Sequence, residues 1–421
     1  MNQIKNIIQH PKLLLFPITI WLATRLIIAI AMLVIVPLSS NSSPEVDIKF
    51  GWDVFFAWDS QFYKTIATSG YEYSLEKKQY YTAFFPLFPL LCRAVMSMGL
   101  TFEIAGTLVN NLAFSLTLTI LYFWIKERYG KSTSRWSIAV LAWCPYSIFG
   151  TVIYTEGLFL LCSTAALIAF DKKQHIWAGF WGALSTAVRL PGIALIPAFL
   201  FVSWKERRGI TAYIASLAVG LGVVFYSLYC QIQFGDALAF IHAQKGWRDS
   251  AGFAWQGWLK MLMEITIGKA NTRYAYIQDP WHPIILLIIL VIAYLLWHFR
   301  VYLGSIKFHY GLCILWLLLW ILVGDELVKS VLIFGGVYLL WFSRAKIPLV
   351  TVIYGFCSYA LIFNTGITAS AERYTYAIVS LAIAFGLLLA RYPRWGYTIL
   401  GFFAILLVTF SLRFAQNQWI A

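Results

Sequence analysis

Long apolar runs separated by short polar loops make up most of this chain. Runs near the ~17–25 residues needed to cross a bilayer lie at 13–37, 104–125, 135–151, 153–170, 211–233, 283–299, 309–323, 327–342, 347–363, 374–390 and 396–412. Helices satisfy their own backbone hydrogen bonds in lipid, so such runs are expected to be helical. The pattern therefore predicts an all-α polytopic membrane protein.

Two further apolar segments do not fit a simple crossing. Between Lys173 and Lys205 the run is interrupted by Arg189-Leu190-Pro191-Gly192, which predicts two short helices meeting at Arg189 in a re-entrant hairpin. The segment 81–99 contains two prolines and Arg93, which favours an interfacial or re-entrant helix. With these segments the pattern predicts about 11–13 transmembrane helices and additional interfacial helices at the outer face.

The charge distribution predicts the orientation of these helices. Only 12% of residues are charged, and the formal net charge is +14. The cations occupy short loops, which is typical of cytoplasmic loops and argues against nucleic acid as a partner. Placing Lys5 and Lys12 in the cytoplasm puts all these loops there. We expect one integral membrane domain, 1–421, with two long outer segments, 38–103 and 234–281.

The first outer segment carries the acids that an enzyme could use. Asp53 and Asp59 lie in GWDVFFAWDSQFY, close to Trp58 and other aromatic residues. A carboxylate at the membrane boundary is costly unless it is solvated, paired or functional. If the segment WDSQFYKTIATSGY is helical, Trp58, Phe62 and Ile66 share one face, as expected of an amphipathic helix lying along the interface. Asp59 serves equally well as a helix-capping residue or as a catalytic acid, and the residues alone do not choose between Asp53 and Asp59.

Other residues have the chemistry to bind a phosphorylated or sugar-bearing substrate. The planar guanidinium of Arg189 suits a phosphate, with an internal ion pair to Glu156 as the alternative. Arg373 could hold a lipid phosphate or extend its charge to the interface. His242, Gln244 and Lys245 lie near Trp247, a combination that suits sugars, although a lone histidine among aromatic residues is more often structural.

Known cofactor motifs are absent from the sequence. It contains no HExxH, GxGxxG, P-loop, CxxC or DxD pattern, so zinc proteolysis, dinucleotide binding and ATP-driven transport lack support. The sequence requires no cofactor, and dependence on a divalent metal stays open.

Several of these motifs resemble one family. WDSQFYKTIATSGY, FFPLFPLL and CPYSIFGTVIYTEGLF, together with STAVRLPG, FGDALAFIHAQKGW and the late ERY, are similar to the PIG-V mannosyltransferases and their bacterial relatives. The resemblance extends from about residue 50 to 390 and implies a GT-C fold with a catalytic acid in the first outer loop. It matches Asp59 to that acid, and Arg189, Gln244 and Arg373 to less specific positions of the family.

The resemblance implies transfer of a sugar, mannose by analogy, from a polyprenyl-phosphate donor to a hydroxyl of a glycan or glycolipid. It implies an inverting reaction at the outer or lumenal membrane face, among membrane lipids. The shorter outer loops favour a bacterial plasma-membrane relative, with the endoplasmic reticulum as the site in a eukaryote. The alternative is a lipid or small-molecule transporter, which would carry internal repeats or acids near the bilayer midplane.

Overall fold

The computed structural model describes residues 14–40, 51–73, 81–247 and 252–420. Lys5 and Lys12, on which the predicted orientation rests, lie outside these residues. The described chain is helical, and its only bridge of β type joins Gly252 to Thr365. It forms two compact units: residues 1–250, 339–361 and 376–421 form unit 1, and residues 251–338 and 362–375 form unit 2. The two units are described separately below.

Unit 1 begins with an apolar helix and the first outer segment. Its helices up to the second outer segment are α2 (Leu15–Ile30), a π-helical turn (Ala31–Ile35), α3 (Val36–Ser40), α4 (Asp59–Thr68), α5 (Leu87–Met96), α6 (Phe102–Trp143), α7 (Glu156–Asp171), α8 (His175–Val188), α9 (Leu195–Lys205), α10 (Ile210–Ala218), α11 (Leu221–Phe234) and α12 (Ala239–His242). Short 3-10 turns cover Gly51–Phe55, Tyr81–Ala83, Pro145–Gly150, Leu190–Ala194 and Ala243–Gly246.

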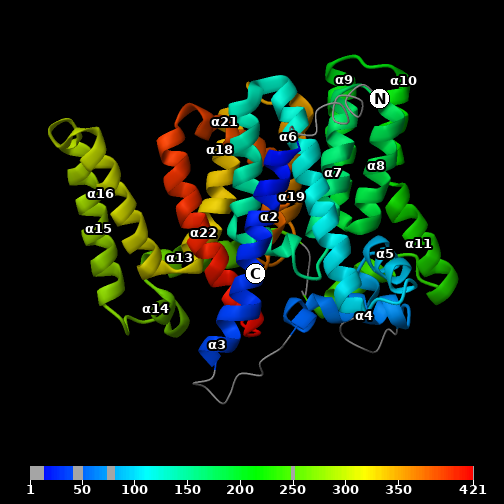
Figure 1. The fold of residues 1–421 in the computed structure, drawn as a ribbon, viewed down its shortest axis with the longest axis horizontal. Helices are drawn as coiled ribbons and strands as arrows, with labels where there is room; N and C mark the ends of the chain where they lie inside the picture. Colours follow the sequence, from blue (N-terminus) through cyan, green and yellow to red (C-terminus); the bar gives the residue numbers. More distant parts are fainter. Residues whose placement is uncertain (1–13, 41–50, 74–80, 248–251, 421) are drawn as a thin grey trace. The chain divides into compact units, whose positions relative to one another are not determined.

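The rest of unit 1 comes from the carboxyl-terminal part of the chain. It comprises most of α18 (Gly336–Ser343) and α19 (Leu349–Phe363), followed by α21 (Val379–Arg391) and α22 (Pro393–Ala415). Helix α6 packs against α2, α7 and α21, and α8 packs against α7, α10 and α11. Figure 1 shows this bundle with α2, α6 and α7 running side by side.

Unit 2 contains the remaining helices. These are α13 (Trp255–Thr266), α14 (Lys269–Tyr274), α15 (Trp281–His298), α16 (Arg300–Val323), α17 (Asp325–Ser330), a π-helical turn (Val331–Gly335) and α20 (Ala371–Tyr376). Helices α15 and α16 pair along their length. The ring centroid of Trp258 lies 6.1 Å from that of Phe334 and 5.1 Å from that of Phe363. This aromatic cluster joins α13 to the π-helical turn and to the last residue of α19.

The predicted polytopic all-α architecture is confirmed. Among the described residues, six helices are long and apolar enough to cross a membrane, and the pair α10–α11, bent by 40°, makes a seventh. Four shorter apolar helices accompany them, and the predicted 11–13 crossings would have to include these. The loop expected between 104–125 and 135–151 is reduced to one point, Gly130, where the backbone turns at φ 84° inside α6.

The run between Lys173 and Lys205 forms the two predicted short helices, which meet at Arg189, and their re-entry into the membrane stays a prediction. Helix α8 ends at Val188, Arg189 is extended (φ −156°, ψ 142°), and the chain continues through a 3-10 turn into α9. Pro191, two residues after Arg189, lacks a backbone N–H and so cannot continue α8 as a regular helix. The break therefore places the Arg189 side chain between two short helices rather than within one continuous span.

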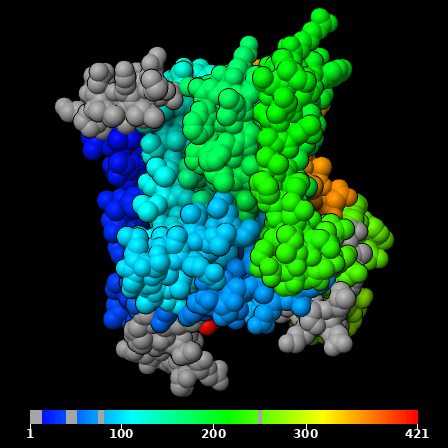
Figure 2. Space-filling view, turned by 90° about the vertical axis from the view of Figure 1, so that its right-hand side faces the viewer, coloured from blue at the N-terminus to red at the C-terminus, as the bar shows by residue number. Residues whose placement is uncertain are grey.

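The first outer segment folds into two short helices joined to each other and to the second outer segment. Arg93 of α5 donates hydrogen bonds to the carbonyl oxygens of Ala67 (2.7 Å) and Ile66 (3.1 Å) at the end of α4, where helix carbonyls lack partners. The Thr82 hydroxyl donates to the carbonyl of Ala239, in the second outer segment, at 3.4 Å, and Tyr226 of α11 donates to the Thr82 carbonyl at 2.8 Å. Figure 2 shows residues 51–73 and 81–101 in blue to cyan beside the green surface of α11 and α12.

Candidate active site

Asp59 is the first residue of helix α4, and an unusual backbone conformation precedes it. Trp58 has φ 47° and ψ −110°, a region that costs a residue with a side chain about 1–3 kcal/mol. Its ring packs edge-on against Phe414 (5.1 Å) and Trp419 (5.4 Å) near the end of the chain. These contacts hold Trp58 in place and fix where α4 begins, so the half-buried carboxylate of Asp59 has a defined position at a helix N-terminus, where negative charge is stabilised.

Hydrogen bonds join the start of α4 to the segment before α7. The buried Ser60 hydroxyl donates to the Ile153 carbonyl at 2.9 Å, and the Ile153 amide donates to the Phe55 carbonyl at 3.1 Å. The Ser60 hydroxyl also accepts from the Ala57 amide at 3.3 Å. These buried hydrogen bonds connect Ser60, the residue after Asp59, with Ile153, which lies three residues before Glu156.

Asn110 of α6 fixes the entry into α7. Its side-chain amide donates to the carbonyls of Phe149 and Val152, both at 2.7 Å, and its carbonyl oxygen accepts from the Gly157 amide at 2.8 Å. A Cβ on Gly157 would lie 2.5 Å from two oxygens of Asn110, so only glycine allows this approach. The contact sets the position of the neighbouring Glu156.

Glu156 and Arg189 form a buried ion pair. The Arg189 guanidinium, at the break after α8, donates to a carboxylate oxygen of Glu156 at the start of α7. Glu156 is 1% exposed and the Arg189 side chain 11%. The ion pair that the sequence left open as the alternative is therefore present. A role for Arg189 in phosphate binding stays a prediction.

Tyr63 connects this ion pair with Asp59. Its hydroxyl lies 3.4 Å from that of Thr155, the residue before Glu156. Burial raises the pKa of Tyr63 above its ordinary value, the negative charge of Asp59 raises it further, and the charge of Arg189 opposes the shift. Charged groups of three segments, Asp59, Glu156 and Arg189, therefore all act on this one hydroxyl. Tyr63 stays protonated and can donate a hydrogen bond.

An aromatic cluster lies beside these polar groups. Phe62 of α4 stacks on Phe84 with ring centroids 4.5 Å apart, and the ring of Trp247 lies 5.7 Å from each. Tyr63 also contacts Phe84, at 5.2 Å. The second outer segment thus contributes Trp247 to the surroundings of α4. The buried face of α4 contains Ser60, Tyr63, Ile66 and Ala67. Trp58 precedes the helix, which starts at Asp59, so, contrary to the prediction, it does not share a helical face with Phe62 and Ile66.

The remaining predicted residues of unit 1 lie around this cluster in different environments. Asp53 is exposed in the 3-10 turn before α4. The His242 ring nitrogen Nδ1 lies 2.7 Å from Asp236, which also accepts from the Tyr73 hydroxyl at 2.8 Å. Gln244 is half-buried and Lys245 is exposed.

The environment of Asp236 favours its charged form. Burial alone would raise the pKa of Asp236, but hydrogen bonds from His242, Tyr73 and a backbone amide outweigh it and hold that pKa below its ordinary value. The negative charge of Asp236 in turn orients the ring of His242.

Arg373 belongs to unit 2, where it is 5% exposed on α20 with its guanidinium 5.5 Å from the Tyr374 ring. Its neighbour Glu372 lies 3.6 Å from Lys329, which lies 3.8 Å from Glu326. Burial raises the pKa of Glu372, and Lys329 opposes this only in part. Among the described residues, no group of three or more His, Cys, Asp or Glu side chains is arranged to hold a metal ion.

The comparison with known families decides the affiliation of the chain. Residues 7–214 match the family model described as Mannosyltransferase (PIG-V). This segment, just under half of the chain, belongs to the PIG-V mannosyltransferase family. The match covers Asp59, Tyr63, Glu156 and Arg189, whereas His242, Gln244, Lys245 and Arg373 lie beyond it. No curated protein matches the sequence significantly.

Solved structures with a similar fold are membrane glycosyltransferases. ArnT from Cupriavidus metallidurans bound to undecaprenyl phosphate has a TM-score of 0.53 at 12% identity, with 93% of this chain and 63% of that chain covered. The apo state of the same enzyme gives 0.51 at 11% identity, covering 91% and 62%. The chain thus has a GT-C-like fold and spans less than two thirds of the length of ArnT.

Sequence reasoning did not select three residues that shape the site. The sequence pattern did not indicate Tyr63 or Asn110. Asn110 could have been found, because a polar side chain inside an apolar run signals a functional or structural contact. Arg25, inside the first span, is 7% exposed and donates to the Ser147 carbonyl (3.0 Å) and the Thr151 hydroxyl (2.6 Å). It braces the same segment that leads to Glu156.

Proposed function

We propose that this chain is a GT-C mannosyltransferase that moves mannose from a polyprenyl-phosphate donor to a hydroxyl of a glycan or glycolipid. Family membership supports mannose as the sugar. The ArnT structure with the similar fold is bound to undecaprenyl phosphate, which supports a lipid-phosphate donor. We place the reaction at the outer or lumenal membrane face, in a bacterial plasma membrane or in the endoplasmic reticulum of a eukaryote.

The observation that carries the proposal is the position of Asp59. It is a half-buried acid at the start of a helix, near Tyr63 and the Glu156–Arg189 ion pair. An enzyme that transfers a sugar to a hydroxyl needs a base at the nucleophile and positive charge at the leaving group. Asp59 and Arg189 carry these two charges, and both act electrostatically on Tyr63.

In the proposed reaction Asp59 removes the proton of the acceptor hydroxyl as its oxygen attacks the anomeric carbon. The bond from that carbon to the phosphate oxygen breaks, and the lipid phosphate leaves with the electron pair. Attack opposite to the leaving group inverts the anomeric configuration. The products are the mannosylated acceptor, the polyprenyl phosphate and a proton, first held by Asp59.

Arg189 faces the charge that develops on the leaving phosphate, and Glu156 sets the orientation of its guanidinium. Tyr63, which stays protonated, donates a hydrogen bond to a substrate oxygen. Trp247 offers a ring on which a sugar can stack, and Asp53, Trp58, His242, Gln244, Lys245 and Arg373 remain candidates for contacts with the substrates. The donor already carries a monophosphate, so the transfer does not oblige a metal that binds diphosphate.

Sugar transfer by the purified protein from radiolabelled polyprenyl-phosphate mannose tests this function. Wild type and Asp53→Asn should transfer mannose, and Asp59→Asn should lose at least about a hundredfold in rate, the lower range of a general-base contribution. Comparable unfolding temperatures of the two variants serve as the control for folding. Wild-type turnover by Asp59→Asn would remove Asp59 from the mechanism. Absence of transfer by wild type to any lipid, peptide or glycan acceptor would count against the function itself.

A further inference from the structure

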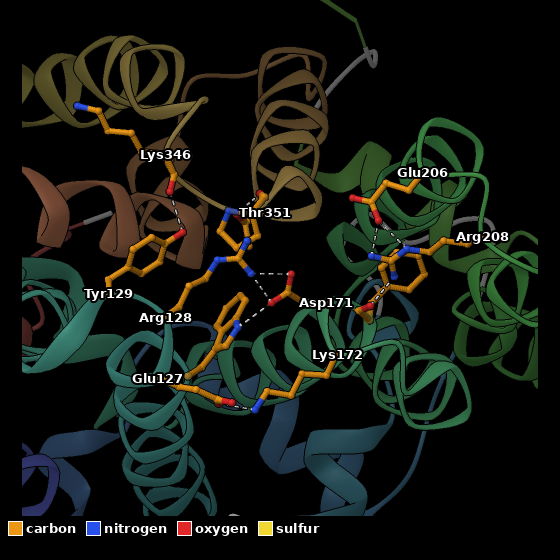
Figure 3. Close-up of polar contacts among 12 residues, drawn as sticks. Glu127, Arg128, Tyr129, Asp171, Lys172, Glu206, Arg208, Lys346 and Thr351 are labelled. Carbon is orange, nitrogen blue, oxygen red and sulfur yellow. Dashed lines mark hydrogen bonds and ion pairs between the residues drawn. The ribbon is translucent and has the colours of Figure 1, made fainter.

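Several cation-bearing turns of unit 1 meet at one end of its helices. The bend of α6 bonds to the α7–α8 turn through Arg128–Asp171 (2.9 Å) and Lys172–Glu127 (2.6 Å). The Tyr129 hydroxyl donates to the Lys346 carbonyl in the α18–α19 turn at 2.8 Å. Figure 3 shows these contacts and how the side chains point toward one another.

Two more turns join the same end. Arg208, in the α9–α10 turn, donates to the Phe170 carbonyl at 2.5 Å near the end of α7. The ring of Trp136 on α6 lies 5.2 Å from that of Tyr397 at the start of α22, which brings the α21–α22 turn alongside. Five turns that are distant in sequence therefore form one surface.

The acidic side chains on these five turns form ion pairs with cations of the same turns. Glu127, Asp171 and Glu206 each form an ion pair, with Lys172, Arg128 and Arg208 respectively. Asp171 also accepts a hydrogen bond from the Trp124 indole at 3.1 Å. These pairs brace helix ends and leave the other cations on the turns uncompensated.

Most of the other charged side chains on these turns are exposed cations. No ion pair found among the described residues involves the following exposed side chains, which we call the basic end: Lys131, Arg135, Lys173, Lys205, Arg207, Arg344, Lys346, Arg391 and Arg394. Like charges at this density repel one another unless anions gather over them. The basic end therefore favours a negatively charged partner.

Exposed aromatic rings lie directly beside these cations. The guanidinium of Arg344 lies 3.9 Å from the ring of Trp341, and the ammonium of Lys346 lies 5.1 Å from that of Phe342. Trp341 is 56% exposed and Phe342 50%. Aromatic residues next to cations at the end of an apolar helix are typical of the lipid headgroup region. The partner should thus have both a negative head and an apolar tail.

We infer that the basic end binds the headgroups of anionic phospholipids, with phosphatidylglycerol as the representative ligand. Phosphate oxygens accept hydrogen bonds from guanidinium and ammonium groups, and the acyl chains would lie against the exposed rings and apolar helices. Soluble anions offer only the first of these contacts. The inference concerns lipid binding alone and does not depend on the proposed transfer reaction.

The experiment measures which lipids the full chain retains. Purified protein in detergent is mixed with equal amounts of phosphatidylglycerol and phosphatidylethanolamine, and bound lipid is counted by native mass spectrometry. The test variant carries Arg344→Gln, Lys346→Gln, Arg391→Gln and Arg394→Gln. The matched control carries Lys64→Gln, Lys260→Gln, Lys269→Gln and Lys307→Gln, which remove the same charge outside the basic end.

Wild type and control should favour phosphatidylglycerol by about tenfold or more, since each nearby cation contributes roughly fivefold. The test variant should lose most of this preference while unfolding at the same temperature as the control. Equal retention of the two lipids by wild type would overturn the inference. An equal loss of preference in both variants would also overturn it, because net charge alone would then explain the binding. The inference would fail as well if added polyprenyl phosphate were the only lipid able to displace the bound phospholipids.

Discussion

The Glu156–Arg189 ion pair predicts an asymmetric response to removal of each partner. Glu156→Gln leaves a guanidinium that cannot lose its proton, in a site where its side chain is only 11% exposed. Arg189→Gln leaves a carboxyl group, which can take up a proton and become neutral. We therefore expect Glu156→Gln to lower the free energy of unfolding by about 3–5 kcal/mol, and Arg189→Gln to lower it less.

The double variant separates stability from chemistry. With both charges gone no buried charge is left unpaired, so the double variant should be within about 1–2 kcal/mol of wild type, giving a coupling energy of at least about 2 kcal/mol. If Arg189 stabilises the leaving phosphate, that folded double variant should still have lost about two orders of magnitude or more in transfer rate.

Unfolding in a titration with denaturing detergent and transfer of radiolabelled mannose measure the two effects on the same preparations. Additive destabilisation by the two single changes would show that the pair does not hold α7 to the break after α8. A double variant with wild-type turnover would refute the role of Arg189 in the reaction and leave it a structural residue.

Three other changes test the framework. Trp58→Gly should be more stable than Trp58→Ala by about 1 kcal/mol, because only glycine adopts φ 47° without strain; thermal unfolding measures this, and a more stable alanine variant would contradict it. Gly157→Ala should cost about 1–3 kcal/mol, whereas Gly401→Ala, where a Cβ would have no neighbour within 4 Å, should cost nothing measurable in the same assay. The pKa of Asp236 is lowered in the folded chain, so its stabilising effect is complete above about pH 5 and is lost as the pH falls below about 4. The difference in unfolding temperature between wild type and Asp236→Asn should therefore shrink from pH 6 to pH 3. A constant difference would contradict this assignment.

Hydrophobic patterning predicted most of the fold because the length of an apolar run is a local property. The break at Arg189 was visible in the sequence, since Arg, Pro and Gly interrupt an otherwise apolar run. The single bend at Gly130 was less visible: the charged residues around it predicted a loop, yet the backbone needs only one residue with positive φ to turn. Local composition indicates that a turn occurs, and tertiary packing decides how short it is.

The site could be predicted only in part, for a different reason. Asp53 and Asp59 both stand out because an acid beside lipid is unusual in any sequence, and the resemblance to the PIG-V family selects Asp59. Tyr63 was not selected, because its importance lies in contacts with Thr155 and with charges from distant segments. His242 was a candidate because of its chemistry, whereas only the structure identifies Asp236 as its partner. Sequence spacing alone does not determine which side chains come within hydrogen-bond distance. Side chains that act through long-range contacts are thus the ones that sequence reasoning misses.

Asp53 and Asp59 were equivalent as sequence candidates, and their structural settings now differ. Asp53 is exposed on a 3-10 turn, where its carboxylate is accessible to solvent. Asp59 follows the strained Trp58 and precedes Ser60, whose hydroxyl is bonded to Ile153 at 2.9 Å. A general base must be held within hydrogen-bond reach of the proton that it removes, and a rigid support achieves this better than a solvated turn. We therefore expect loss of transfer in Asp59→Asn and near-normal transfer in Asp53→Asn, and the opposite result would show that positional rigidity is the wrong criterion for this site.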